Sequence, residues 1–330
     1  MKFPMISFVI ATFNGERTID RCLKSILEQD YPKNKIEIII VDGGSIDKTL
    51  NIIKKYPVKL LYNNKKLAEG PGMGKALGGK NAKGDYICYV DQDNILVGKE
   101  WLKEMINPFL KDLSISIVQS QLYINKKTNL INHYIGIIGI EDPYAISNAI
   151  TSQLIFNKKL FIEKKDFFLF KMNSKNQFYF GNNGGIYRKK EFEEIGGYSR
   201  ENDMCCEFSR MKIILAIPKK AYLYHNSYSN FLNFIKKRGN HFKRFILANY
   251  KQRKYKWKGR YLKEKGRFYV NIIKNLIIFP ALFYSMYKTL KEKDAVWILH
   301  PIFLFVITMV YLCLIIIYLP KGSLKAFSNS

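Results

Sequence analysis

Two carboxylates stand one residue apart at Asp91 and Asp93, directly after the short apolar run Tyr86–Val90. The run is typical of a buried strand, and a charged pair at the end of such a strand is costly unless something compensates it. Mg²⁺ and Mn²⁺ favour paired carboxylate oxygens, usually completed by substrate phosphates. The spacing therefore predicts a site for Mg²⁺ or Mn²⁺, with an acidic turn that binds nothing as the alternative.

The stretch upstream of this pair alternates strand-like and helix-like patterns. Short apolar runs rich in β-branched residues predict strands at 5–11, 36–41 and 58–62, and apolar spacings of three and four predict helices between them. Strands that alternate with amphipathic helices indicate a mainly parallel sheet covered on both faces. We therefore expect an α/β fold of the Rossmann-like type.

Polar residues follow three of the expected strands, at 12–16, 42–45 and 91–93. The carboxyl ends of parallel strands meet at one edge of a sheet, and ligands of open α/β sheets bind there. We expect these three segments to lie on one rim, around a common ligand.

A glycine-rich loop is expected at 69–80, before the strand that ends at Asp91. It does not match a P-loop, because three residues instead of four separate Gly70 from Gly74, and Ala76 replaces the required Ser or Thr. Lys75 still offers a point charge for a diphosphate. The alternative is a solvated lysine on a surface loop.

Three motifs, Phe8–Asn14, Ile39–Thr49 and Gly84–Asp93, resemble in order and spacing those of family 2 inverting glycosyltransferases with the GT-A fold. The resemblance covers roughly the first hundred residues. It implies a GT-A-type mixed, mainly parallel sheet flanked by helices, and a nucleotide-diphosphate-sugar donor. One departure is visible, because Lys75-Ala76 stands where the family often shows Arg-Asn.

The resemblance also implies roles for single residues. Asp42 is implied to meet the base, and Asp91 and Asp93 to handle the ribose and the metal-bound diphosphate. The residues expected to bind the nucleotide sugar are Thr12, Asn14, Glu16, Asp42, Ser45, Lys75 and Asp91.

A second glycine-rich stretch follows at Gly181–Arg188, and in the family it lies under the donor sugar and the acceptor. Glycine permits close backbone approach, and asparagine amides bond sugar hydroxyls. We therefore expect Asn182, Asn183 and Gly184 to contact a sugar. A strand with a bulge is the alternative.

The family's general base is a carboxylate shortly after a Gly-Gly-aromatic turn, and Asp203 fits that distance best. Glu207 lies one helical turn later, so both are candidates for the catalytic base. These acids alternatively cap a helix and pair with Arg200 or Arg210. His225 is a third candidate metal ligand, or a structural histidine.

The net charge of +27 is unevenly distributed over the 330 residues. Fourteen Lys or Arg fall between 236 and 267, with Glu264 as the only acid. Such a block suggests nucleic acid, an anionic membrane surface or a phosphorylated substrate. The five cysteines show no zinc-site spacing, and a reduced compartment is the simpler interpretation; no signal peptide is expected.

The C-terminal part is strongly apolar. Residues 295–319 contain no formal charge and span about 37 Å at ~1.5 Å per residue, enough for a bilayer core of ~30 Å. We expect a transmembrane helix there, and a helix at 268–290 that spans beside it or lies in the interface. The expected domains are a GT-A domain at 1–230, a basic amphipathic segment at 231–267 and a membrane region at 268–330.

The resemblance implies a glycosyltransferase, and the apolar and basic patterns of the C-terminal part predict that it lies on the cytoplasmic face of the cell membrane. Its expected partners are a nucleotide-diphosphate sugar, a lipid-linked or glycan acceptor and anionic lipids, with no nucleic acid. The alternatives are a sugar-phosphate nucleotidyltransferase, which shares the need for metal and phosphate contacts, and a non-catalytic nucleic-acid-binding protein suggested by the basic block.

Overall fold

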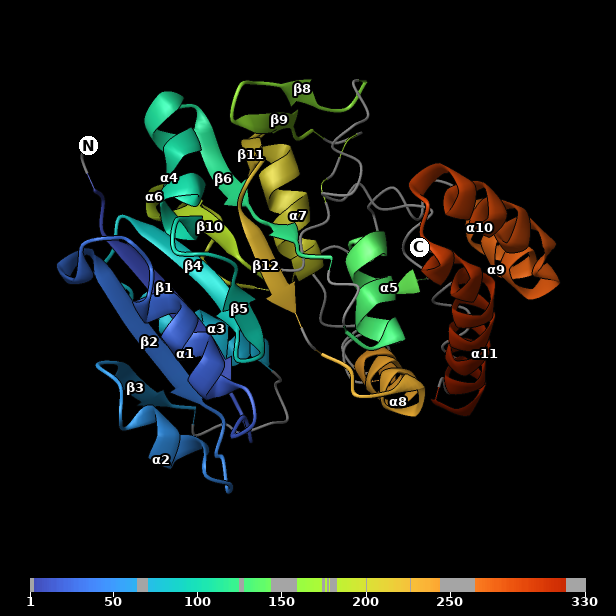
Figure 1. Cartoon of the computed structure of the whole chain (residues 1–330), viewed down its shortest axis with the longest axis horizontal. Coiled ribbons are helices and arrows are strands. Elements are labelled where there is room, and N and C mark those ends of the chain that lie inside the picture. The colour runs from blue at the N-terminus through green and yellow to red at the C-terminus, as the bar shows by residue number, and fades with distance from the viewer. Residues whose placement is uncertain are drawn as a thin grey trace. The chain divides into compact units, whose positions relative to one another are not determined.

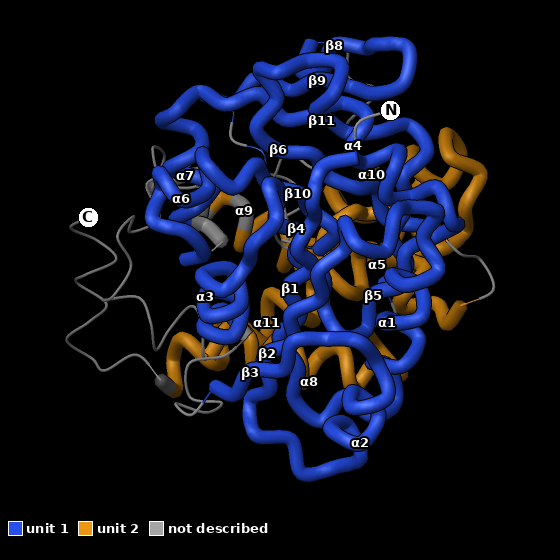
Figure 2. Tube along the Cα trace, turned by 90° about the vertical axis from the view of Figure 1, so that its left-hand side faces the viewer, with its two compact units in different colours: residues 1–123, 150–226 blue, residues 124–149, 227–330 orange. Residues whose placement is uncertain are grey.

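The computed structural model describes residues 3–63, 71–124, 128–143, 159–173, 176, 178, 183–199, 201–225, 227–243 and 265–318. The chain forms two compact units, which we call unit 1 (1–123 and 150–226) and unit 2 (124–149 and 227–330) (Figure 2). The domain boundaries expected after residues 230 and 267 stay predictions.

Unit 1 is built on a sheet in which nine strands are described (Figure 1). From edge to edge they are β3 (Lys59–Tyr62), β2 (Ile36–Asp42), β1 (Ile6–Thr12), β4 (Tyr86–Asp91), β10 (Gly185–Arg188), β6 (Ile115–Gln119), β11 (Ile214–Pro218), β9 (Phe167–Lys171) and β8 (Ile162–Glu163). The first four are parallel, β6 and β11 are parallel, and β10 is antiparallel to β4 and β6. The sheet is mixed, and most of its described strands run in one direction, as expected.

A smaller sheet contains β5 (Asn94–Leu96), β12 (Tyr222–His225) and β7 (Gln121–Leu122), in that order. The apolar runs 115–123 and 216–224 each predict one strand in the sequence, but each is divided between the two sheets. At the first division Ser120 N–H bonds to Gly184, while Gln121 N–H bonds to Ala221. At the second, Pro218 lacks an N–H and ends the ladder.

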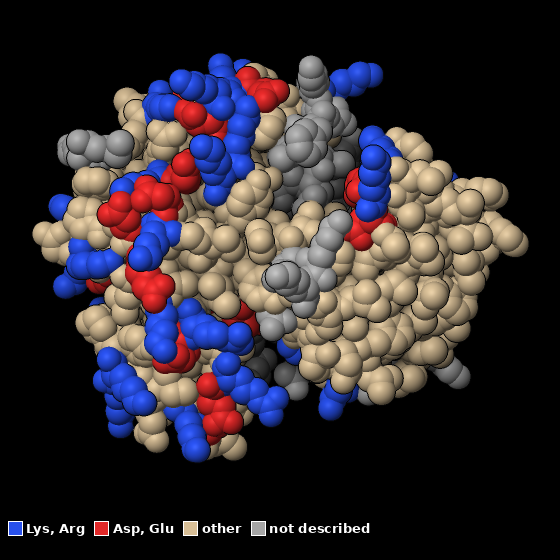
Figure 3. Space-filling model, viewed as in Figure 1, with Lys and Arg blue, Asp and Glu red and all other residues tan. Residues whose placement is uncertain are grey.

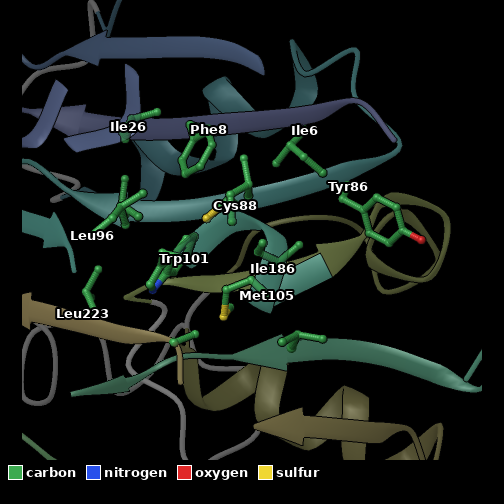
Figure 4. Packing of buried hydrophobic residues seen from close by; sticks show 14 of the residues in the cluster. Ile6, Phe8, Ile26, Tyr86, Cys88, Leu96, Trp101, Met105, Ile186 and Leu223 are labelled. Atoms are coloured by element: carbon green, nitrogen blue, oxygen red, sulfur yellow. The ribbon is translucent and has the colours of Figure 1, made fainter. Parts of the chain in front are cut away.

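Helices cover both faces of the large sheet. α1 (Ile19–Leu27), α2 (Thr49–Ile53) and α4 (Trp101–Lys111) cover one face, and α3 (Pro71–Lys80), α6 (Lys189–Glu194) and α7 (Glu201–Arg210) cover the other. Strand side chains alternate between the layers, so that Phe8 faces the first and Val9 the second. Figure 4 shows Phe8, Cys88 and Trp101 packed in the first layer.

The glycine-rich segment is the helix α3 from Pro71 onward, and the loop expected there is wrong. A Cβ on Gly78 would lie 2.4 Å from Cγ1 of Val9, and one on Gly79 would lie 2.2 Å from the hydroxyl of Tyr89. Real side chains do not approach so closely, so the glycines let α3 pack directly on the sheet. This contact outweighs the poor helix propensity of glycine, which costs ~1 kcal/mol per residue.

In the sequence the aromatic run 167–170 suggests a cover for an acceptor groove, a membrane contact or part of a packed helical insertion, but it forms strand β9 (Phe167–Lys171). Its four side chains are all at most 7% exposed. Phe167 and Leu169 enter one core layer, and Phe168 and Phe170 the other. A strand buried on both faces shows such a continuous apolar run.

Unit 2 is helical in its described part. Its helices are α5 (Leu130–Ile138), α8 (Phe231–His241), α9 (Lys265–Ile277), α10 (Phe279–Glu292), the 3₁₀ helix η7 (Ala295–Leu299) and α11 (His300–Tyr318). Asn230 caps α8 by accepting the N–H of Asn233. The apolar spacing at 231–250 predicts one helix in the sequence; α8 ends at His241, and residues 244–250 lie outside the description.

The continuous helix expected at 268–290 is two helices, α9 and α10. Ile278 between them has φ +65°, and Pro280 lacks an N–H, so the helix cannot continue through this point. Within the described residues, one helical segment, Ala295–Ile317, is long and apolar enough to cross a membrane. The transmembrane assignment of 295–319 itself stays a prediction.

Replacing Gly78 by Ala should destabilise unit 1 by about 1–3 kcal/mol, because the new methyl group would overlap Val9. Chemical denaturation followed by circular dichroism measures the change. The matched control is Gly72→Ala on the same helix, where a Cβ would only contact Tyr198 at 3.7 Å. The control should leave stability unchanged or raised; equal effects of the two changes would contradict the close packing of α3.

Candidate active site

The ends of the central strands meet at one edge of the sheet, as the sequence predicts. In the sheet register Thr12 pairs with Asp42, and Ala11 pairs with Asp91. β10 runs in the opposite direction, so its start lies at the same edge, and Gly184 N–H donates to the carbonyl of Tyr89 at 2.8 Å. We call this edge, with the loops that leave it, the strand-end edge.

Asp91, Asp93 and His225 form a compact group at this edge, with one ligand atom from each within 4.8 Å of the others. Nε2 of His225 is 3.3 Å from Oδ1 of Asp93, and the His225 side chain is 6% exposed. The pairing of β12 with β5 places His225 opposite Asn94, whose Oδ1 accepts the N–H of Asp91 at 2.7 Å. Asn94 thus contacts the group on two sides, since its side chain binds the backbone of Asp91 and its strand position pairs with His225. The sequence analysis did not select Asn94 for this role.

Lys75 of α3 contributes a buried positive charge to this group. Its Nζ lies 2.7 Å from Oδ1 of Asp91, and its side chain is only 3% exposed. The interpretation as a solvated loop lysine is therefore wrong. An ammonium group is buried at tolerable cost only beside an opposite charge. Lys75 therefore neutralises much of the Asp91 charge, while Asp93 faces His225.

The loops after β1 and β2 are hydrogen-bonded to each other. Asn14 N–H donates to Oγ of Ser45 at 3.0 Å, and Oδ1 of Asn14 accepts the N–H of Ile46 at 3.0 Å. Oε2 of Glu16 accepts the N–H of Lys48 at 3.1 Å. Asn14 adopts a left-handed backbone with φ +47°, which asparagine tolerates better than most residues. Asn14, Glu16 and Ser45, which are expected to lie beside the nucleotide, thus also fix the conformation of the two loops.

Asp42 shapes the second of these loops. It is 1% exposed, and its carboxylate accepts N–H groups from Gly44 and Ser45 at 2.8 and 2.9 Å and the Ser45 hydroxyl at 2.5 Å. The three bonds hold the turn that follows β2. A contact between Asp42 and a base stays a prediction.

Gln92, the residue between the two acids, is another that the sequence analysis did not select. Its Oε1 accepts the hydroxyl of Thr12 at 2.5 Å and the N–H of Phe13 at 3.1 Å. A Cβ on Gly15 would lie 2.3 Å from this oxygen, so the β1 loop and the acidic turn are closely packed. The only signal in the sequence was its position between Asp91 and Asp93.

Asn183 and Gly184 lie at the strand-end edge, whereas Asn182 lies outside the described residues. Gly184 has φ +63°, and a Cβ there would lie 2.4 Å from Oγ of Ser120. Nε2 of Gln119 donates to the carbonyl of Asn183 at 2.8 Å. In the part of the chain that the structure describes, Oε1 of Gln119, Oγ of Ser120 and Oδ1 of Asn183 are buried without a hydrogen-bond partner. Buried acceptors of this kind are costly unless water or a ligand pairs them.

α7 carries both candidate bases, Asp203 and Glu207. It ends just before β11, whose start lies at the edge opposite the strand-end edge. α7 packs on the sheet through Met204 and Phe208, so its first turn, with Asp203, returns toward the strand-end edge. Asp203 is 7% exposed, while Glu207 is 17% exposed and lies 4.0 Å from Arg210.

Cys22 of α1 lies in the field of the acidic pair, and its thiol donates to the carbonyl of Asp91 at 3.5 Å. Burial, together with the charges of Asp93 and Asp91, raises the pKa of this thiol well above its usual range. Cys22 therefore stays protonated and adds no charge to the group.

Residues 7–190, more than half of the chain, match the model of Glycosyl transferase family 2. The chain belongs to this family. Its membership confirms the family 2 resemblance seen in the three motifs. The GT-A-type fold expected from the motifs is confirmed as well.

Named relatives are similar over part of the chain. A poly(ribitol-phosphate) beta-N-acetylglucosaminyltransferase, TarS of Staphylococcus aureus, is 37% identical over 107 residues, which are 32% of this chain and 18% of TarS. The chain thus spans about a fifth of that relative. The solved structure of TarS 1–349 with UDP-GlcNAc has a TM-score of 0.50 at 17% identity and covers 98% of this chain and 92% of its own.

A second solved structure has the higher TM-score of 0.59 at 14% identity. It is the mannosyltransferase PcManGT from Pyrobaculum calidifontis in complex with GDP-Man and Mn²⁺, and the match covers 94% of this chain and 88% of that chain. At such low identities, the similarity of this chain to the two solved structures shows the fold alone.

The residues at the strand-end edge fit a divalent cation. Two carboxylates and one imidazole lie close enough to share an ion, and the oxygen-rich set suits Mg²⁺ or Mn²⁺. The imidazole favours Mn²⁺ of the two, since Mg²⁺ prefers oxygen ligands throughout.

Replacing Lys75 by Met should raise the affinity for Mn²⁺ without nucleotide by about tenfold, because a positive charge near the ion is removed. Isothermal titration calorimetry measures the dissociation constant. Lys80→Met, at an exposed lysine of the same helix, is the matched control and should leave the affinity unchanged. Weaker Mn²⁺ binding in the Lys75 variant would argue that Lys75 supports the site only structurally.

Proposed function

We propose that this chain moves a sugar from a nucleotide-diphosphate sugar to a hydroxyl of a membrane-linked or polysaccharide acceptor. The transfer inverts the anomeric carbon and is assisted by Mg²⁺ or Mn²⁺. The observation that carries the proposal is the group Asp91, Asp93 and His225, beside buried Lys75, at the strand-end edge of a family 2 domain.

The donor lies along the strand-end edge. Asp93, His225 and Asp91 hold the cation, which when bound neutralises charge on the departing diphosphate. Lys75 adds a point charge beside the same phosphates. Two structures of similar fold, one solved with UDP-GlcNAc and the other with GDP-Man and Mn²⁺, support this class of donor.

The nucleotide rests against the loops at 12–16 and 42–45. Hydrogen bonds of five predicted nucleotide-binding side chains already hold these loops together; the five are Thr12, Asn14, Glu16, Asp42 and Ser45. Loops that are already fixed lose little conformational entropy when the nucleotide binds. More of the binding free energy is then available to orient the donor.

The transferred sugar and the acceptor meet near the start of β10. Asn183 and Gly184 line this place, with Asn182 before them, and the buried oxygens of Gln119 and Ser120 lie beside them. Sugar hydroxyls can donate to these oxygens, which accept no other hydrogen bond among the described residues.

Asp203 is the proposed general base, with Glu207 as the second candidate. The acceptor hydroxyl loses its proton to the carboxylate while its oxygen attacks the anomeric carbon, and the bond to the diphosphate breaks. The attack comes from the side opposite the leaving group, which inverts the carbon. Burial of Asp203 in the α7 turn near the strand-end edge supports this choice, since Glu207 lies one turn farther away and beside Arg210.

The enzyme works at the cytoplasmic face of the cell membrane. The apolar segment Ala295–Ile317 supports attachment, and the basic block 236–267 suits anionic lipids. A lipid-linked or polymeric acceptor follows from this location, and the relative's name, a poly(ribitol-phosphate) transferase, is compatible with a polymer.

The alternatives are less well supported. A nucleotidyltransferase would release pyrophosphate, whereas family 2 membership favours release of a nucleoside diphosphate. Nucleic-acid binding calls for a basic face, but the visible face of unit 1 mixes Lys and Arg with Asp and Glu (Figure 3).

Replacing Asp93 by Asn should lower sugar transfer by about 100-fold or more and weaken Mn²⁺ binding, because one charged ligand is lost. Nucleoside-diphosphate release and calorimetric titration with Mn²⁺ measure the two effects. Asp85→Asn is the matched control, because Asp85 precedes the same strand at its other end. Full activity of the Asp93 variant would overturn the metal role.

Replacing Asp203 by Asn should lower kcat by about 10²–10⁴-fold and leave donor KM and Mn²⁺ affinity unchanged. Glu207→Gln should retain most of the activity. Steady-state kinetics with a saturating acceptor measures both variants. The reverse order of effects would assign the base to Glu207, and a large change in donor KM would point to a binding role for Asp203.

A further inference from the structure

α10 buries small residues and exposes large apolar ones, which is the reverse of the pattern of a helix at an aqueous surface. Its buried face consists of the small residues Ala281 and Ser285, at 8% and 1% exposure. Its outer face consists of large apolar side chains, which are Phe279, Leu282, Phe283, Met286, Tyr287 and Leu290, at 38–78% exposure. A helix at an aqueous surface buries its large apolar side chains and exposes polar ones.

The same outward apolar character continues on the neighbouring helices of unit 2. α9 exposes Val270, Ile273 and Ile277 at 44–55%, three and four residues apart. α11 exposes Ile302, Met309 and Ile316 at 40–78%, seven residues apart. α9, α10 and α11 contact one another, so these stripes belong to one packed group of helices.

The visible side of this helix group, which we call the α9–α11 face, is nearly free of charge. Figure 3 shows it almost entirely in tan, in contrast to the mixed charges of unit 1. Soluble proteins rarely expose large contiguous apolar patches, and such patches mark binding to a membrane or a partner.

Lysines and tyrosines at the edge of the α9–α11 face indicate what kind of partner covers it. Between residues 270 and 318 the sequence has four lysines against one Glu and one Asp. Nζ of Lys291 lies 5.5 Å from the ring of Tyr287, which is 57% exposed. Lysine and aromatic rings at an apolar margin suit the headgroup level of a bilayer, and the positive excess suits anionic lipids.

The geometry of the helices decides how they meet the bilayer. α9 and α10 have 13 and 14 residues, or roughly 20 Å each, too short for a core of ~30 Å. α11 is longer, but it packs along α8, with Phe234 against Phe303 and Gly239 against Val310. Crossing the bilayer would take the α8 lysines with it, at high cost.

Polar side chains within unit 2 tie α11 to this arrangement. Tyr311 donates to Asp142 at 2.8 Å, and His300 is bonded to Tyr134 at 2.6 Å. Arg238 of α8 lies 3.2 Å from Glu141. These bonds hold one side of α11 on a polar layer and leave its opposite stripe for lipid.

We propose that the α9–α11 face lies in the plane of an anionic bilayer, with its apolar side chains among the acyl chains and without crossing the membrane. The proposal rests on the membrane location given above, not on the chemistry of the active site. It replaces a single crossing at 295–319 by an in-plane surface made of three helices.

Leu290→Glu in the full chain should weaken binding to phosphatidylglycerol–phosphatidylcholine vesicles by about tenfold or more, because an apolar side chain leaves lipid and a charge enters. Co-sedimentation with the vesicles measures binding. Leu232→Glu is the matched control, because Leu232 on α8 is 76% exposed and Leu290 is 78% exposed. Equal effects of the two changes would overturn the proposal.

A second copy of the chain is the competing occupant of this face. Sedimentation velocity of the unchanged chain and the Leu290 variant in detergent-free buffer tests it. The proposal would be overturned if the unchanged chain formed a dimer, the Leu290 variant did not, and both bound the vesicles equally well. Nucleotide-sugar hydrolysis by both variants in detergent reports on the proposed catalytic function separately, and it should stay unchanged.

The in-plane orientation has its own test, a protease-cleavable tag placed after Ser330. Inside-out membrane vesicles, prepared sealed from cells that express the chain, expose the cytoplasmic face to added protease. Cleavage of the tag in sealed vesicles is expected, because α11 does not cross. Protection of the tag until detergent opens the vesicles would show a crossing helix and overturn the proposal.

Discussion

The ion pair between Lys75 and Asp91 is the interaction on which the site depends. It forms because α3 packs directly on the sheet, and α3 does so only because glycines face Val9 and Tyr89. A buried lysine without its carboxylate would be strongly destabilising, so the pair fixes the position of α3 and of the end of β4 together. With the Asp91 charge largely compensated, Asp93 and His225 carry the remaining capacity for a cation.

The loops around this pair are built from side chains that the family motif suggests for ligand binding. Asn14 and Ser45 bond across two loops, and Gln92 bonds Thr12 beside the acidic turn. Such bonds are made during folding, so the border already has its shape when a nucleotide arrives. A motif residue can therefore be needed for the loop and for the ligand at once, and substitution of it would test both roles together.

Local patterns explain what could be predicted from the sequence. The alternation of strands and helices, and the acids at the end of β4, are signals within a few residues, and they place the strand-end edge correctly. Errors arose where distant contacts decide. Glycines read as a loop form α3 because of their fit to the sheet, and β6 ends at Gln119 because the pairing partner changes there. Gln92 and Asn94 have no local signal, since their importance comes from the groups they bond.

The C-terminal helices show the same limit of composition. An apolar count detects α11, but it does not give the direction of the α10 side chains, with Ser285 inward and Phe283 outward. That direction is set by Ser285, which donates to the carbonyl of Trp297 at 2.6 Å, and by the chain reversal at Ile278. A polar bond that turns an apolar face outward is stabilising only if something other than water covers that face. An in-plane membrane surface satisfies this condition, and it also keeps the protein on the surface where a lipid-linked acceptor would be found.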